Sequence, residues 1–396
     1  MSNLTDLENK YYMQVARRQP VVIVRGQGTL VWDENDKEYL DFTSGWAVNT
    51  LGHCHPALVR AVEEQARTLM QTSNQFYTVP QVKLAQLLVE NSCLDRIFFS
   101  NSGAEANEGA VKLARKYGKI NRNGAYEVIT ALNSFHGRTL TMAAATGQPS
   151  YQEQWQPLAP GFINVPYNDI EAIKAATNSN TCAVMLEPVQ GEGGVNVPSM
   201  DYLKQVREWC DEQNLVMVLD EVQTGIGRLG TLFGYERFGV EPDAITLAKG
   251  LGGGVPIGAF MAKEKFCLLS PGDHGSTYGG NALTCAGSFA VVDHVIQNDI
   301  PAYAETVGQH LRDGLNALAS RYENITEVRG MGLLIAVQFS SDISGQMVSL
   351  CNEEGLLLNP VRPNAIRFMP PLNVSQQEVD KALERLEIAL GKVVSG

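Results

Sequence analysis

Lys249 and Asp220 are the two residues of this chain whose types and spacing most strongly indicate chemistry. Lys249 stands between an apolar run and a glycine-rich turn, in Ile-Thr-Leu-Ala-Lys-Gly-Leu-Gly-Gly-Gly, and Asp220 ends another apolar run 29 positions earlier. A lysine in a partly desolvated pocket can be neutral and can form an imine with an aldehyde. An aspartate at a strand end can keep a pyridine nitrogen protonated. The pair therefore predicts a site for pyridoxal phosphate.

A phosphate site is predicted where Ser100-Asn-Ser102-Gly103-Ala104-Glu105 follows an apolar run and opens a helical pattern. The backbone amides, the Ser102 hydroxyl and the helix dipole can converge there on an anion. Ser102 and Glu105 also match a simple capping box, and for the motif alone that interpretation is favoured. Its place after an expected strand shifts the balance toward phosphate binding.

Three further side chains have spacing that suits a binding cleft. Phe135 and Arg138, in Asn-Ser-Phe-His-Gly-Arg, could stack on a cofactor ring and bind a carboxylate, although each is also typical of a core or surface residue. Glu192 follows Glu187 in a glycine-bracketed turn. Such turns usually only reverse the chain, but a buried glutamate there could pair with an arginine.

Two other patterns do not lead to a functional prediction. Gly225-Ile-Gly227-Arg-Leu-Gly230 matches a dinucleotide fingerprint, yet residues 231–241 contain two more glycines and no amphipathic repeat, so the required helix is missing. His53 and His55 have no further ligands at suitable spacing, and we expect no metal site.

The elements expected to position these residues are short apolar strands that alternate with helices, which is typical of an α/β fold with a mainly parallel sheet. Ligands of such sheets gather at the carboxyl ends of the strands. The expected strands are Arg96–Ser100, Glu127–Ala131, Phe162–Pro166, Cys182–Glu187, Leu215–Glu221, Ala244–Ala248 and Ile257–Ala262.

A second, smaller domain is expected after His294, because the pattern changes there to a polar helix followed by new strands. These strands are expected near Gly332–Phe339, Leu356–Val361 and Ile366–Met369. The last helix should begin at a capping box formed by Ser375 and Glu378. Its apolar stripe is expected to be core and comprises Val379, Leu383, Leu386 and Leu390.

Composition limits the class of partner. With 44% hydrophobic and 19% charged residues among 396, the chain is typical of a globular protein, and a net charge of -12 argues against nucleic-acid binding. The first residues contain no secretion signal, and no long uncharged apolar stretch follows. We therefore expect a cytoplasmic protein that binds small molecules and no membrane.

With these residues assembled, the chain resembles the fold-type I, class III aminotransferases over nearly its whole length. The motifs that carry the resemblance include Leu-Gly-His-Cys-His-Pro, Asn-Ser-Gly-Ala-Glu-Ala-Asn, Phe-His-Gly-Arg-Thr-Leu, Glu-Pro-Val-Gln-Gly-Glu-Gly-Gly-Val, Asp-Glu-Val-Gln-Thr-Gly, Ala-Lys-Gly-Leu-Gly-Gly-Gly and His-Gly-Ser-Thr-Tyr-Gly-Gly-Asn. The resemblance implies a large cofactor-binding domain at 56–290, a small α/β domain at 291–396, and an N-terminal segment at 1–55 that packs with the small domain.

The resemblance also implies a role for each site residue. Lys249 would be the Schiff-base lysine and Asp220 the partner of the pyridinium nitrogen. Phe135 would stack on the ring and Gln223 would approach its hydroxyl. The residues implied to hold the phosphate are Ser102, Gly103, Ala104 and, from the neighbouring subunit of a homodimer with shared active sites, Thr277.

The activity implied is ping-pong transfer of an amino group to 2-oxoglutarate, with N-acetylornithine or a similar ω-amine as donor. Arg138 and Arg367 would bind the two carboxylates of 2-oxoglutarate, and Glu192 would pair with Arg367 when a donor with one carboxylate is bound. Trp46 stands where related enzymes that act on acetylornithine carry a small aliphatic residue. It would either narrow the pocket or pack under the N-terminal segment, so ω-amine:pyruvate, 4-aminobutyrate and ornithine aminotransferases remain alternatives.

Overall fold

The computed structural model describes residues 2–395, and the side chains of residues 4–393. Its centre is a seven-stranded sheet in the order β4-β10-β9-β8-β7-β5-β6. All neighbouring strands are parallel except at β10, which runs antiparallel to both β4 and β9. The strands are β4 (Arg96–Ser100), β5 (Glu127–Ala131), β6 (Phe162–Val165), β7 (Thr181–Leu186), β8 (Val216–Asp220), β9 (Ala244–Leu247) and β10 (Gly258–Ala262). The mainly parallel sheet is thereby confirmed, each strand within two residues of its expected ends.

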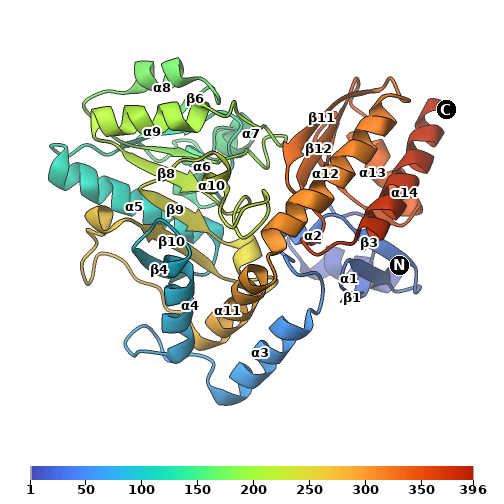
Figure 1. Ribbon diagram of the computed structural model, residues 1–396, viewed down its shortest axis with the longest axis horizontal. Helices are drawn as coiled ribbons and strands as arrows, with labels where there is room; N and C mark the ends of the chain where they lie inside the picture. The colour runs from blue at the N-terminus through green and yellow to red at the C-terminus, as the bar shows by residue number, and fades with distance from the viewer. Residues whose placement is uncertain (1, 396) are drawn as a thin grey trace.

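Helices cover both faces of this sheet, which is why its central strands are apolar at nearly every position. Because successive side chains of a strand point to opposite faces, Val128 and Met185 pack with α5 (Gly103–Asn121), whereas Ile129 and Val184 pack with α9 (Tyr202–Gln213). Figure 1 shows α8 and α9 together beside the sheet. The remaining helices of this part are α3 (Pro56–Thr68), α4 (Val79–Glu90), α6 (Leu140–Ala145), α7 (Pro149–Gln152), α8 (Ile170–Ala176), α10 (Gly234–Arg237) and α11 (Ala282–Gln297).

Two smaller sheets lie beside the large one. The first joins β1 (Ile23–Gln27), β2 (Leu30–Asp33) and β3 (Glu38–Asp41) to β13 (Leu356–Leu357), so both ends of the chain contribute to it. The second is antiparallel, in the order β11-β12-β15-β14. Its strands are β11 (Ile325–Met331), β12 (Leu334–Phe339), β14 (Asn359–Arg362) and β15 (Ala365–Phe368).

The structure corrects the expected strands of this C-terminal region in two ways. Strand β11 was not anticipated, because its mixed burial in Ile-Thr-Glu-Val-Arg-Gly-Met gives no alternating pattern. The single strand expected over 356–361 is two strands, β13 and β14, which belong to different sheets. The intervening Leu358 is fully buried. Sequence periodicity does not report this change of partner.

The remaining helices of the chain are α1 (Ser2–Tyr11), α2 (Ser44–Ala47), α12 (Ile300–Ala319), α13 (Ser344–Glu353) and α14 (Gln376–Ser395). Three one-turn 3-10 helices complete the elements: η1 (Glu153–Trp155), η2 (Lys249–Leu251) and η3 (Glu264–Phe266). The capping box before α14 is confirmed, since Ser375 Oγ accepts from the Glu378 N–H and Glu378 Oε2 accepts from the Ser375 N–H. None of the helices among the described residues combines the length and apolarity needed to cross a bilayer.

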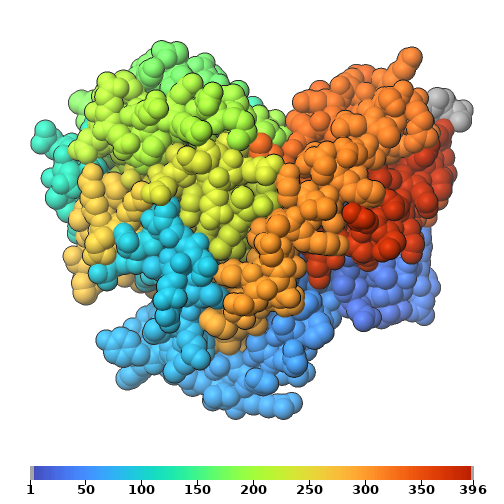
Figure 2. Space-filling model, viewed as in Figure 1, coloured from blue at the N-terminus to red at the C-terminus, as the bar shows by residue number. Residues whose placement is uncertain are grey.

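The division into 1–55, 56–290 and 291–396 stays a prediction, and its outermost residues, Met1 and Gly396, lie outside the described part. The expected boundary at 290 falls inside α11. In Figures 1 and 2 the C-terminal region and the large sheet form two bodies that meet along a V-shaped notch, with the N-terminal strands below the C-terminal body.

Candidate active site

A cavity of about 380 Å³ lies at the carboxyl ends of the large sheet's strands. This is the edge at which ligands of parallel sheets bind. Nine residues singled out from the sequence line it: Ser102, Gly103, Ala104, Phe135, Arg138, Glu192, Asp220, Gln223 and Lys249. Each stands at the end of a strand, on the loop that follows one or in the first turn of the helix after that loop, which is how positions distant in sequence come to share the cavity.

Lys249 is the second residue after β9 and the first residue of η2, and its side chain lines the cavity. Its φ of +42° is a left-handed conformation that a non-glycine residue rarely adopts, and such conformations cluster at functional sites. Burial lowers the pKa of Lys249, with Arg367 adding to the effect and Glu192 opposing it. The result favours the neutral, nucleophilic amine.

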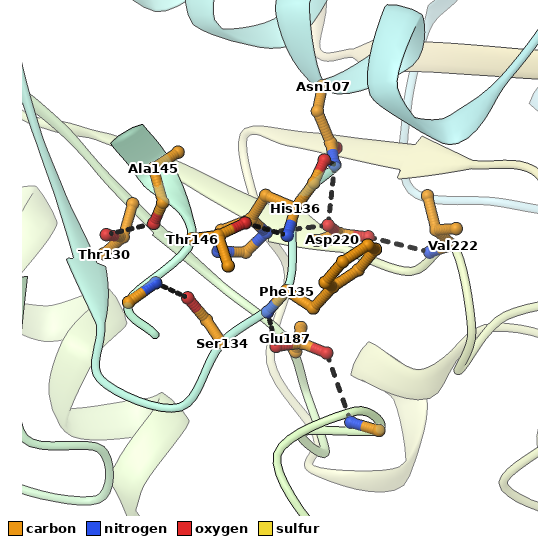
Figure 3. A network of polar contacts seen from close by, with 12 residues as sticks. Asn107, Thr130, Ser134, Phe135, His136, Ala145, Thr146, Glu187, Asp220 and Val222 are labelled. Atoms are coloured by element: carbon orange, nitrogen blue, oxygen red, sulfur yellow. Dashed lines mark hydrogen bonds and ion pairs between the residues drawn. The ribbon is translucent and has the colours of Figure 1, made fainter. Parts of the chain in front are cut away.

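Asp220 ends β8 and is held by three donors (Figure 3). Its Oδ2 accepts from Asn107 Nδ2 and from His136 Nδ1, both at 2.8 Å, and its Oδ1 accepts from the Val222 N–H at 3.0 Å. An ionised carboxylate only accepts, so the proton of this His136 pair lies on Nδ1. Burial would lower the pKa of His136, but the hydrogen bond and charge of Asp220 outweigh it and raise that pKa.

Asn107 and His136 are functional candidates that the sequence reasoning missed. Asn107 also donates to the His136 carbonyl at 2.7 Å, so the two residues and Asp220 form a closed triangle of buried contacts. The signal was available, because Asn107 lies one turn into the helix opened by Ser102 and His136 follows Phe135 directly. What was not available was the knowledge that these loops meet.

The predicted phosphate site lies at the N-terminus of the 19-residue helix α5. Ser102 is the N-cap, and its Oγ accepts from the Glu105 N–H at 3.2 Å. Only half of a capping box forms, because Glu105 Oε2 accepts from the Asn101 backbone and side chain instead. A Cβ added at Gly103 would lie 2.9 Å from Val222 Cγ1, so the backbone approaches this edge closely. The free amides and dipole suit an anion.

Arg367, Glu192 and Gln223 form a bridged cluster next to the cavity. Arg367 Nη1 lies 2.8 Å from Glu192 Oε1 and donates to Gln223 Oε1 at 3.1 Å, while Gln223 Nε2 donates to Glu192 at 3.3 Å. Arg367 is fully buried, and its Nε and Nη2 have no hydrogen-bond partner. Burial favours a neutral Glu192, but the charges of Arg367 and Lys249 lower its pKa to about 2.

Arg138 is exposed at the mouth of the cavity, with its guanidinium 4.3 Å from the centroid of the Tyr151 ring. The Phe135 ring lies in the cavity wall and meets Tyr151 edge-on, at 5.5 Å between centroids. A cation held on an aromatic face at the mouth can exchange that contact for a carboxylate.

Trp46 and Thr277 do not line the cavity of a single chain. The Trp46 side chain is 60% exposed, so the expectation that it packs under the N-terminal segment is wrong. Thr277 is exposed, and its carbonyl accepts from Gln71 Nε2. Their expected roles toward substrate and toward a neighbouring subunit's phosphate stay predictions.

The patterns set aside from the sequence have structural explanations. Residues 225–230 form a turn followed only by the four-residue α10, and buried Arg228 donates to the carbonyls of Leu333 and Pro370. His53 pairs with Asp41 at 2.8 Å, and His55 caps α3. Among the described residues, no group of three or more His, Cys, Asp or Glu could hold a metal ion.

A buried lysine with a depressed pKa, a buried aspartate clamped by three donors and a helix N-terminus, all at one edge of an α/β sheet, define an enzyme site for an aldehyde cofactor with a phosphate. The family model for class-III aminotransferases matches residues 11–390. The chain belongs to the class-III aminotransferase family and is a transaminase with the fold-type I architecture.

Similar proteins come from several organisms. The chain is 49% identical to an acetylornithine aminotransferase of Caldanaerobacter subterraneus, over 98% of each chain. Its fold matches an ornithine aminotransferase of Toxoplasma gondii with a TM-score of 0.95 and 36% identity, covering 99% of this chain and 95% of the other. An N-acetylornithine aminotransferase of Stenotrophomonas maltophilia gives a TM-score of 0.86 and 37% identity, covering 99% and 100%.

Enzymes of this family depend on pyridoxal phosphate, and the residues present fit that group. A second structure of the Toxoplasma enzyme is described as having partial occupancy of the cofactor at its active site. Here the close backbone approach at Gly103 and the amides of α5 match its phosphate, and the Asp220 carboxyl group matches its ring nitrogen.

Proposed function

We propose that this transaminase moves the terminal amino group of N-acetylornithine to 2-oxoglutarate, giving the semialdehyde and glutamate by a ping-pong mechanism. This assignment would place it in arginine biosynthesis. It is supported by the names of relatives that are 46–50% identical over nearly the whole chain. The observation that carries it is the Glu192–Arg367 pair, because this pair suits alternation between one-carboxylate and two-carboxylate substrates.

The pair works as a gate in this proposal. When the donor presents its ω-amino end, Glu192 neutralises Arg367, so no buried guanidinium is left uncompensated. When 2-oxoglutarate enters, its α-carboxylate replaces Glu192 on Arg367, whose Nε and Nη2 are free to complete a two-pronged contact. Arg138 takes the distal carboxylate at the cavity mouth.

Pyridoxal phosphate, when bound, supplies an aldehyde that takes up the amino group and a ring that withdraws electrons. Ser102, Gly103 and Ala104 would hold its phosphate, and Phe135 would stack on its ring. Gln223 would approach the ring hydroxyl.

Lys249 and Asp220 have the two proton-handling roles. Asp220, whose oxygens accept from three donors, would hold a proton at the ring nitrogen. Lys249, whose pKa burial lowers, is the base that removes a proton from the donor carbon bearing the amino group and returns one to the cofactor carbon. Both side chains line the same cavity.

We also propose a homodimer in which Thr277 completes the partner subunit's phosphate site. Two segments are tied together near this residue, since Gln71 and Asn74 donate to the carbonyls of Thr277 and Ser276. Large apolar side chains are exposed on or beside both segments: Phe76 (65%), Tyr77 (99%), Val79 (67%) and Tyr278 (64%). Exposed apolar groups gathered in this way are typical of an interface.

The test compares N-acetylornithine, ornithine and 4-aminobutyrate as donors, each with 2-oxoglutarate or pyruvate as acceptor. We expect N-acetylornithine with 2-oxoglutarate to have the highest kcat/KM and to yield one glutamate per semialdehyde. A preference for ornithine would favour the activity of the Toxoplasma neighbour. A preference for a simple ω-amine with pyruvate would replace the proposal and would bring Trp46 back as a pocket residue.

A further inference from the structure

Glu187 is a buried carboxylate in the cavity wall to which the mechanism above gives no role. It follows β7 directly and is 6% exposed. Its Oε2 accepts from the Phe135 N–H at 3.1 Å, and its Oε1 accepts from the Gly191 N–H at 3.2 Å. Figure 3 shows Glu187 between the Phe135 backbone and the loop below it. Each oxygen therefore holds a different loop.

The two loops that Glu187 joins both carry groups that face substrate or cofactor. One presents Phe135 and Arg138, and the other presents Glu192 directly after Gly191. The start of the turn that carries Glu192 is also held by Tyr167, whose hydroxyl donates to the carbonyls of Glu187 and Pro188. Position and orientation of the Glu192 carboxylate thus depend on how firmly Glu187 holds the Gly191 amide.

We infer that Glu187 is a positioning residue for substrate selection, which holds the turn carrying Glu192 against the Phe135 loop and thereby keeps the Glu192–Arg367 gate closed for ω-amine donors. The inference rests on the proposed function for its substrates. Releasing Glu187 weakens the closed gate, so Arg367 is less well neutralised when a donor is bound and more open to an α-carboxylate. Discrimination between the two substrate classes should fall.

The hold of Glu187 on the two loops depends on pH, because it depends on the charge of the Glu187 carboxyl group. Burial raises the pKa of Glu187 to about 7, against the nearby charge of His136, which lowers it. The other titratable groups that act on it or feel its charge are Asp220, Lys249 and Tyr167. Above pH 7 both oxygens accept, whereas below it one oxygen becomes a hydroxyl and holds its amide poorly.

The experiment replaces Glu187 by glutamine in the holoenzyme, with Glu221→Gln as a matched control. Glutamine can accept from only one of the two amides and presents donors to the other. Glu221 is also buried and also binds two backbone amides, those of Gly234 and Tyr235, but it lies outside the cavity wall. Hydrogen exchange followed by mass spectrometry should show segments 132–138 and 188–196 exchanging about tenfold faster in E187Q, the effect of one lost hydrogen bond. E221Q should leave both segments unchanged.

The kinetic measurement is the ratio of kcat/KM for N-acetylornithine to kcat/KM for glutamate. We expect this ratio to fall about tenfold in E187Q, mainly through the donor's KM, and to stay unchanged in E221Q. In the wild type it should fall below pH 7, and in E187Q that pH step should be absent. Equal losses for both substrates, or faster exchange without a change in ratio, would overturn the inference.

Failure of the inference can be told apart from failure of the proposed function. If the wild type does not use N-acetylornithine, the proposed function fails. Hydrogen exchange of the two segments still tests the Glu187 clamp, that is, the hold of Glu187 on the Phe135 and Gly191 amides. If E187Q does not fold, Glu187→Asp keeps the charge but is too short to reach both amides, and the same two readouts apply. Unchanged exchange in the folded variants overturns the clamp whatever the substrate.

Discussion

At the scale of single residues, the chemistry depends on a few side chains whose surroundings set their charge. Glu192 and Lys249 lie in one cavity, yet burial has a different net result on the pKa of each. Lys249 loses its proton more easily because burial dominates. Glu192 stays ionised because Arg367 and Lys249 outweigh burial. Because their surroundings differ in this way, Lys249 can act as a base while Glu192 keeps its charge.

The first prediction concerns Lys249→Ala. Removing the base for proton transfer should lower kcat by about 10³-fold, since general base catalysis typically contributes 10² to 10⁴. The near-ultraviolet to visible absorbance band expected of a lysine-linked aldehyde cofactor should be absent from the purified variant. Retention of full activity by this variant would contradict the mechanism.

At the scale of elements, loops at strand ends are held by buried carboxylates that bind backbone amides. Glu221, just after β8, caps the first turn of α10 through the N–H groups of Gly234 and Tyr235. Burial nevertheless raises its pKa to about 7. A carboxylate with this shift makes stability depend on pH in a direction that can be measured.

The second prediction is this pH dependence. Because the folded pKa of Glu221, about 7, exceeds the ordinary value of 4.5, the folded protein keeps a proton that the unfolded chain has lost. The contribution of Glu221 to the free energy of unfolding is therefore fully present below pH 4.5 and is lost as pH rises through about 7. The free energy of unfolding, measured with denaturant, should therefore fall less steeply between pH 4.5 and about 7 in Glu221→Gln than in the wild type. An identical slope in the two proteins would show that Glu221 does not titrate there.

The third prediction concerns the first residue of α5. In Gly103→Ala the new Cβ meets Val222 at 2.9 Å, which should displace the helix start or the loop after β8. Overpacking of this kind costs about 1–3 kcal/mol, so we expect cofactor affinity, measured by fluorescence titration, to fall about tenfold. Gly345→Ala in α13, where an added Cβ meets nothing within 4 Å, is the control and should bind cofactor normally. Equal cofactor affinities in Gly103→Ala and the wild type would mean that the predicted phosphate site at the start of α5 does not depend on this close backbone approach.

At the scale of the whole molecule, the site lies on one chain except for the predicted contribution of Thr277. The fourth prediction is that Tyr77→Asp, at a side chain 99% exposed, places a charge in the proposed subunit interface and converts dimer to monomer in size-exclusion chromatography with light scattering. Activity should fall as the dimer is lost. Ile388→Asp, on α14 and 50% exposed, should leave both unchanged. A fully active monomer would contradict shared active sites.

The sequence by itself determined the large sheet and most of the cavity lining. Continuous apolar runs predict buried strands locally, and residues just past strand ends in a parallel sheet must meet at one edge, so Ser102, Phe135, Asp220 and Lys249 could be placed together. The turn itself indicated Glu192 as a possible partner of an arginine, the family motifs then supplied Gln223 and Arg367, and the contacts among the three are seen here.

Only the tertiary structure decided which loop residues pair at that edge. His136 and Asp220 are 84 positions apart, and no local pattern indicates that one ring nitrogen reaches that carboxylate. The same holds for the Glu187 clamp, for the change of sheet between β13 and β14, and for the exposure of Trp46. Periodicity reports whether a position is buried, whereas its partner depends on how distant loops converge.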